Sequence, residues 1–167
     1  GKKPQVPSDS FVHPAAVLIG DVRIGHECLI APGACLRADF GPIIIGDRTS
    51  IQDNAVIHVY PGSESTIGDD VTVAHGVMLH DAQIKSRCMI GIGAIILFNV
   101  VCEEDVFVSV GAQVPRGMHV PAGKVVGGIP AKVVRDVTEK DKAAARDGIE
   151  AYRDLCRRYI ASMKSIS

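Results

Sequence analysis

Three of the six histidines, His58, His75 and His80, lie within a short stretch, and imidazole is a common ligand for zinc. His58 directly follows Ile57 and His80 directly follows Leu79, two aliphatic residues that occupy the same place in a six-residue repeat. If the repeats stack as coils, these two histidines share a column and lie about 4.8 Å apart, as neighbouring strands do. That spacing lets both imidazoles reach one metal ion.

His75 belongs to the previous side of the coil. It precedes His80 by five residues, which span about 16 Å when fully extended, whereas a Zn–N bond is about 2.0–2.1 Å long. A site that uses all three histidines must therefore take His75 from a neighbouring subunit, and a homotrimer offers that contact three times because its ring of interfaces closes. Three neutral imidazoles would leave a fourth position open, as in catalytic zinc sites. The alternative is three unrelated histidines on a polar, solvent-facing surface.

Polar residues near these histidines fit the same hypothesis. Arg37 falls in the column of the histidine pair, while Gln52 and Asp53 follow an inward isoleucine, so that Asp53 shares a column with His75. A carboxylate beside an imidazole suits the orientation of a metal ligand, and Gln52 could hydrogen-bond solvent or bicarbonate at the metal. The alternative for Arg37, Asp39 and Asp53 is an ion-pair network between subunits, which is compatible with a place beside the site.

The six-residue repeat predicts the element that positions these side chains. A period of six matches neither the 3.6-residue period of a helix nor the uninterrupted alternation of a long strand. It does match a coil with three short strands per turn, whereas a sandwich of short strands would show turns at 8–12-residue spacing. We therefore expect an all-β solenoid, a left-handed parallel β-helix of hexapeptide repeats, over residues 1–135. Its predicted inward residues are Val12, Leu18, Ile24, Ile30, Leu36, Ile45, Ile51, Ile57, Ile67, Val73, Leu79, Ile84, Ile90, Ile96, Cys102, Val108, Val114, Val120 and Val126.

The repeat is broken at residues 37–44 and 59–66, and a one-residue slip follows Leu79. Inserted loops on solenoids tend to carry the binding face, so these breaks mark the side where a site is expected.

A helical appendage is expected at residues 136–167. Thr138 and Asp141 form a capping-box pattern, and Gly148 could split or bend the helix that follows. One apolar stripe at helical spacing is interpreted as a packing face against the solenoid or a neighbour rather than as a ligand site. It comprises Ile149, Tyr152, Leu155, Cys156, Tyr159, Ile160 and Met163.

Composition limits the function classes. The formal net charge is −1 with both signs interspersed, which argues against a nucleic-acid partner. The five cysteines are scattered, odd in number and never arranged CxxC, which favours a reducing cytoplasm over a disulfide framework. The longest apolar run, residues 89–102, is about 14 residues long and interrupted by glycine, too short to span a bilayer. No membrane partner is expected.

Several short motifs together resemble the γ-class carbonic anhydrase family. They are Arg37-Ala38-Asp39, Gly46-Asp47-Arg48, Ile51-Gln52-Asp53-Asn54, Val56-Ile57-His58, Ala74-His75-Gly76 and Leu79-His80. The solenoid resemblance covers roughly residues 10–135, and the motif run 37–80 is its specific part.

The resemblance implies a homotrimeric lyase for CO2 hydration with metal sites between subunits. His58 and His80 would come from one subunit and His75 from the next, holding Zn²⁺, or Fe²⁺ or Co²⁺. The same resemblance makes Arg37, Asp39 and Asp53 interface ion-pair residues and places Gln52 beside the solvent at the metal; these four complete the candidate catalytic set.

Departures from the family pattern keep other functions open. Phe40 stands where the prototype active members have a glutamate, and the stretch 59–66, with Glu64 as its only carboxylate, replaces a longer acidic loop that carries a proton-shuttle glutamate. The segment 151–158 instead resembles the carnitine-operon and phenylacetate-degradation subgroup, which is associated with acyl-CoA metabolism.

We therefore weigh three functions. The first is reversible hydration of CO2 to bicarbonate, slow or buffer-dependent without the shuttle. The second is an acyl-CoA thioesterase or another acyl-CoA-related hexapeptide-repeat transferase. The third is a non-catalytic trimeric scaffold whose metal only locks the interface. The specific motif run favours the first.

Overall fold

Inward aliphatic side chains fill the axis of a solenoid of stacked, three-sided coils. In the computed structural model, which describes residues 1–163, every predicted inward residue from Ile24 to Val126 is buried, and Val12 and Leu18 pack partly buried against this core. A second, smaller residue is buried two positions earlier in most hexads, for example Ala34 before Leu36. The predicted left-handed parallel β-helix is confirmed.

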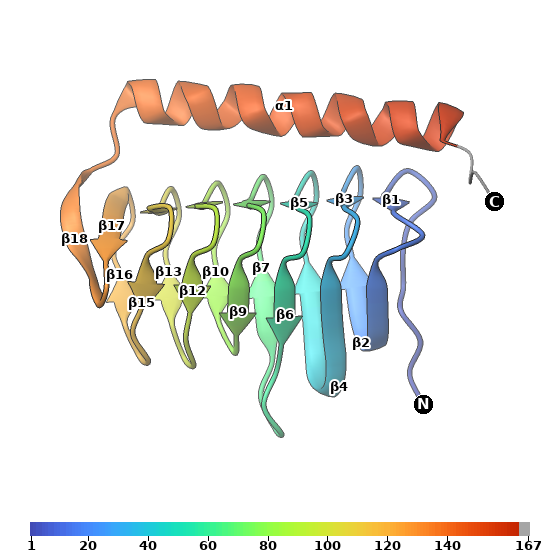
Figure 1. The fold of residues 1–167 in the computed structure, drawn as a ribbon, viewed down its shortest axis with the longest axis horizontal. Helices are drawn as coiled ribbons and strands as arrows, with labels where there is room; N and C mark the ends of the chain where they lie inside the picture. Colours follow the sequence, from blue (N-terminus) through green and yellow to red (C-terminus); the bar gives the residue numbers. More distant parts are fainter. Residues whose placement is uncertain (164–167) are drawn as a thin grey trace.

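Most coils contribute one short strand to each of three faces, whereas β2 (Val17–Ile24) and β4 (Cys35–Ile45) are longer strands that each span two faces (Figure 1). The first face contains β1 (Phe11–Val12), β3 (Leu29–Ile30), β5 (Ser50–Ile51), β8 (Thr72–Val73), β11 (Met89–Ile90), β14 (Phe107–Val108) and β17 (Lys124–Gly128), all parallel. The second face contains the first halves of β2 and β4, then β6 (Val56–His58), β9 (Met78–His80), β12 (Ile95–Ile96) and β15 (Gln113–Val114). The third face contains the second halves of β2 and β4, then β7 (Ser65–Ile67), β10 (Gln83–Ile84), β13 (Val101–Cys102) and β16 (His119–Val120).

The predicted register breaks appear as coils of unequal length. The coil that runs from Phe11 to its partner Leu29 is regular, with three hexads and no inserted loop. The next two coils, from Leu29 to Ser50 and from Ser50 to Thr72, are longer because each has extra residues between the second and third faces. The expected loop at 37–44 is not a separate loop, since these residues lie within the continuous strand β4, whereas residues 59–64 do form a loop between β6 and β7. The coil from Thr72 to Met89 is shorter than the regular coil, which is the predicted slip. Both insertions leave the corner between the second and third faces.

The last strand closes the solenoid in the opposite sense. β18 (Ala131–Asp136) runs antiparallel to β17, with an irregularity between Val125 and Val126. The chain therefore leaves the repeat here and turns back toward the helix.

Helix α1 (Glu139–Ser162) lies along the solenoid as one continuous helix, so Gly148 does not interrupt it (Figure 1). Thr138 caps it through the predicted capping box with Asp141. Ile149 and Cys156 of the predicted stripe are buried against the coils, together with Ala145, and Tyr152, Leu155 and Tyr159 are half-buried. The predicted packing face is therefore confirmed for this part of the stripe, whereas Ile160 and Met163 are exposed.

Two arginines fix the far end of α1. Arg153 and Arg157 each donate to Glu27 at 2.6 Å, and the Cys156 thiol donates to the carbonyl of Cys28 at 3.2 Å. The predicted division between 135 and 136 into two domains stays a prediction, and residues 164–167 of the appendage lie outside the described residues. In the described part of the chain, no helix has the length and apolarity needed to cross a bilayer.

Candidate metal centre

His58 and His80 lie side by side because parallel strands bring equivalent residues into one column. β6 pairs with β9 so that His58 faces His80, and β4 pairs with β6 so that Arg37 faces His58, as the repeat predicted. Nδ1 of His58 is 3.0 Å from Nε2 of His80, with the two ring planes at 87°. Two imidazole nitrogens at this distance form half of a site that could hold a transition metal.

Each ring of the pair is also held by a carboxylate. Nε2 of His58 lies 3.1 Å from Asp39, and Nδ1 of His80 lies 3.1 Å from Asp81. Asp39 also accepts from the Arg37 guanidinium at 2.7 Å, which together with His58 lowers the pKa of the Asp39 carboxyl. Such contacts orient imidazoles in metal sites. No motif in the sequence predicted the contact of Asp81 with His80.

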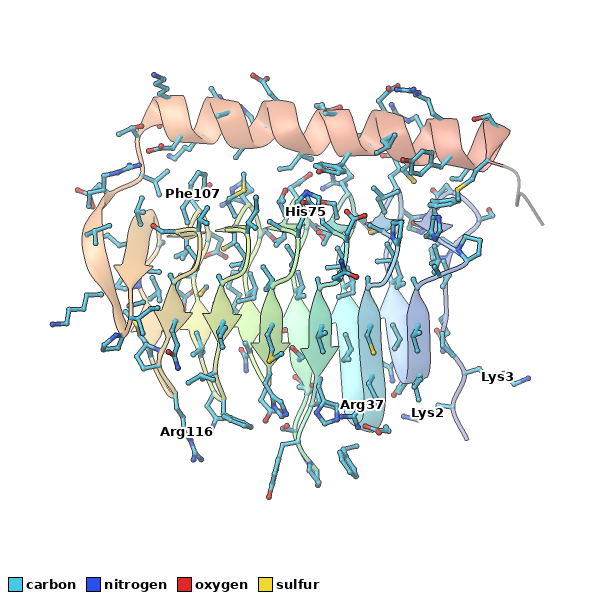
Figure 2. The ribbon with its side chains drawn as sticks, viewed as in Figure 1. Lys2, Lys3, Arg37, His75, Phe107 and Arg116 are labelled. Carbon is cyan, nitrogen blue, oxygen red and sulfur yellow. The ribbon has the colours of Figure 1, made fainter. Side chains whose placement is uncertain are left out.

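His75 lies at another corner of the coil, between the first and second faces. Its Nδ1 is 2.8 Å from Asp53, as their shared column predicted, and its side chain is 45% exposed. Figure 2 shows His75 on the edge of the solenoid nearer α1 and Arg37 on the opposite edge. Within residues 1–163, no cluster of three or more histidine, cysteine or acidic residues could hold a metal ion. The donors fit a metal only if the His58–His80 pair of one chain meets His75 of another.

An exposed apolar surface separates the two half-sites. Met78, in the middle of the second face, is 51% exposed, and Ile92 and Val110, which follow His75 along its corner, are 51% and 72% exposed. Val17, Cys35, Val56 and Ile95 continue the outward column of Met78. A contiguous apolar surface of this kind is typical of a protein–protein interface.

Gln52 and Tyr152 face a groove that begins at His75. Gln52 is buried, and the groove, about 480 Å³ in volume, runs between α1 and the coil corner with mostly apolar walls. Tyr152 reaches it from α1, and burial, with the nearby charge of Asp53, raises the pKa of its phenol. From the sequence, Tyr152 is expected only on the packing face of the helix, because nothing in a helical stripe indicates which residue lies beside a distant coil.

The bend of β4 around Gly41 lies directly against loop 59–64. A Cβ at Gly41 would fall 1.9 Å from the carbonyl oxygen of Ser63, so only glycine allows this approach. Phe40 is largely exposed, with its ring centroid 5.8 Å from that of His58. The residue that follows Asp39, beside His58 and His80, is therefore aromatic and is not a carboxylate.

No protein-family model matches the chain. Curated relatives do match over nearly its whole length. Gamma carbonic anhydrase 1, mitochondrial, of Arabidopsis thaliana is 36% identical over 166 residues, which are 96% of this chain but only 60% of that protein. The carnitine operon protein CaiE of Escherichia coli O157:H7 is 34% identical over 163 residues, covering 98% of this chain and 83% of that protein. Among solved structures, a hexapeptide transferase family protein from Anaplasma phagocytophilum is 35% identical with a TM-score of 0.91, covering 95% of this chain and 94% of that one.

Proposed function

Since the chain belongs to the γ-carbonic anhydrase-like family of hexapeptide-repeat proteins, we propose that it is a metal-dependent enzyme that hydrates CO2 reversibly to bicarbonate. The observation that carries the proposal is the position of the three histidines. His58 and His80 lie side by side at one edge of the apolar second face, and His75 lies at its opposite edge.

Three chains would complete the site by packing their second faces together. His58 and His80 of one subunit and His75 of the next would hold one ion per interface, and the apolar surface around Met78 supports this contact. Three imidazoles suit zinc, and Fe²⁺ or Co²⁺ also accept them. A bound zinc ion would supply Lewis acidity that lowers the pKa of a water ligand to about 7.

The protein's own residues would orient the histidine ligands and the substrate. Asp53 fixes the ring of His75, and Asp39, held by Arg37, does the same for His58. Gln52, buried near His75, would offer its amide to an oxygen of CO2 or bicarbonate. Arg37, Asp39 and Asp53 would thus position the ligands and join the subunits.

Proton export would depend on solution buffer. CO2 hydration releases one proton per turnover, and the ring of Phe40 occupies the position after Asp39 where a carboxylate could relay it. Glu64 is exposed on the loop. A small diffusible base would therefore accept the proton, and turnover would rise with its concentration.

A second candidate function is hydrolysis of an acyl-CoA thioester by the same centre. The groove between α1 and the coils reaches His75 and has the apolar walls that an acyl group needs. In that reaction, water adds to the thioester carbonyl, and the carbon–sulfur bond breaks to leave a carboxylic acid and a thiol. The relationship to CaiE and to a hexapeptide transferase family protein supports keeping this candidate. The cytoplasmic location stays a prediction.

Metal analysis, light scattering and stopped-flow CO2 hydration, with and without added imidazole, test the proposal. We expect a trimer with about one metal per subunit and hydration that disappears in His58→Ala and His80→Ala. A monomer with a full metal complement would contradict the shared site. Thioester cleavage lost in His58→Ala, without CO2 hydration, would favour the hydrolase. A metal-bound trimer without either activity would favour the scaffold.

A further inference from the structure

One buried carboxylate, Asp81, connects the His80 ring to the inserted loop of the preceding coil. Its side chain is only 5% exposed. One carboxylate oxygen accepts the backbone N–H of Tyr60 at 2.6 Å and the hydroxyl of Ser63 at 2.5 Å. The other oxygen lies 3.1 Å from Nδ1 of His80. Both oxygens are therefore used, one for the loop and one for the imidazole.

The unequal coil lengths place Asp81 where it can make these contacts. Between β9 and β10 the corner contains only residues 81–82, whereas between β6 and β7 it contains residues 59–64. Asp81 adopts φ +51°, a left-handed conformation that aspartate tolerates better than most residues. Its backbone N–H donates to the carbonyl of His58 at 3.2 Å, and its own carbonyl accepts from the N–H of Asn99 at 2.9 Å. The short corner thus lies against the long loop.

We infer that Asp81 is a positioning residue for the metal centre: one of its oxygens is held by loop 59–64, and the other selects the tautomer of His80. A carboxylate only accepts hydrogen bonds, so Nδ1 of His80 must carry the proton that it donates. Nε2, the nitrogen that faces His58, then keeps its lone pair free to bind a metal. The inference rests on the proposed function for its purpose but on the hydrogen bonds above for its geometry.

The Asp81→Asn substitution isolates this role because an amide has one acceptor oxygen for three donors. If the amide oxygen stays with Tyr60 and Ser63, its NH2 group faces Nδ1 of His80 and favours the opposite tautomer. A proton would then occupy Nε2. The matched control is Ser63→Ala, which removes one loop contact of Asp81 and leaves its contact with His80 intact.

The first measurement is the tautomer of His80 in the metal-free protein, read from nitrogen-15 chemical shifts of the histidine rings. We expect the Nδ1-protonated form in the wild type and in Ser63→Ala, and its loss in Asp81→Asn. A wild-type His80 protonated at Nε2 alone would overturn the inference, even if Asp81→Asn failed to fold.

The second measurement is zinc affinity by chelator competition. Loss of an outer partner of a ligand typically lowers metal affinity about 10–100-fold, which we expect for Asp81→Asn, with Ser63→Ala within about threefold of wild type. A folded Asp81→Asn protein with unchanged affinity and unchanged tautomer would refute the positioning role. If the wild type bound no metal, the proposed function would fail, while the tautomer measurement would still decide what Asp81 does.

Discussion

Mixing two inactive variants gives a quantitative test of the shared site. His58→Ala removes the pair from every subunit but leaves His75, whereas His75→Ala does the reverse. The two half-sites lie on opposite edges of one face, so neither variant alone should bind metal at the centre. In a mixed trimer, one interface joins an intact pair to an intact His75.

The expected recovery follows from the threefold arrangement. Random 1:1 assembly gives mixed trimers in about three quarters of cases, and every mixed ring contains one interface of the right order. Metal content should therefore reach about one quarter of the wild-type value. The assay is co-refolding, isolation of trimers and metal analysis, and His119→Ala is the control, because His119 pairs with Glu103 away from the centre. Mixed trimers that recover no metal would refute the division of ligands between subunits, as would full metal binding by either variant alone.

Three further substitutions test proton transfer, the stability of the core and the role of the apolar second face. Phe40→Glu should raise CO2 hydration at low buffer at least about tenfold without changing metal content, because it adds a proton acceptor; a rate that ignores imidazole in the wild type would contradict this. Leu79→Ala should lower the free energy of unfolding by about 2–5 kcal/mol in denaturant titrations, since Leu79 is buried beneath His80, and a change well under 1 kcal/mol would mean that the core collapses around it. Met78→Lys should give folded monomers in light scattering and no bound metal in metal analysis, because it places a charge in the apolar second face. Met163→Lys, at the end of α1, is the control and should remain trimeric. A trimeric Met78→Lys protein would argue for a different interface.

The sequence predicted which residues of the candidate centre lie side by side. In a strict repeat, residues at equivalent positions of successive coils stack in one column. Once inward residues were six apart, His58 had to face His80, and Asp53 had to face His75. The same logic located both insertions, since each appears as extra residues between inward positions, but it did not show that the first would continue as strand β4.

The missed contacts depend on features that no repeat encodes. Asp81 reaches the loop of the preceding coil through a left-handed backbone conformation, and only the folded corner shows that Tyr60 and Ser63 lie within hydrogen-bond distance. Tyr152 belongs to a helix whose position along the solenoid is fixed by distant contacts such as the Arg153–Glu27 ion pair. Long-range docking of this kind leaves little trace in local spacing.

The antiparallel strand at the end of the solenoid bears on how copies of this chain can aggregate. A parallel β-helix ends in a strand edge whose free N–H and C=O groups could template another chain and so start a filament. β18 covers the edge of β17 with a strand of opposite direction, which interrupts the parallel stacking on the first face. On the first face, a second copy therefore cannot add a parallel strand directly to β17, which disfavours end-to-end fibre growth there.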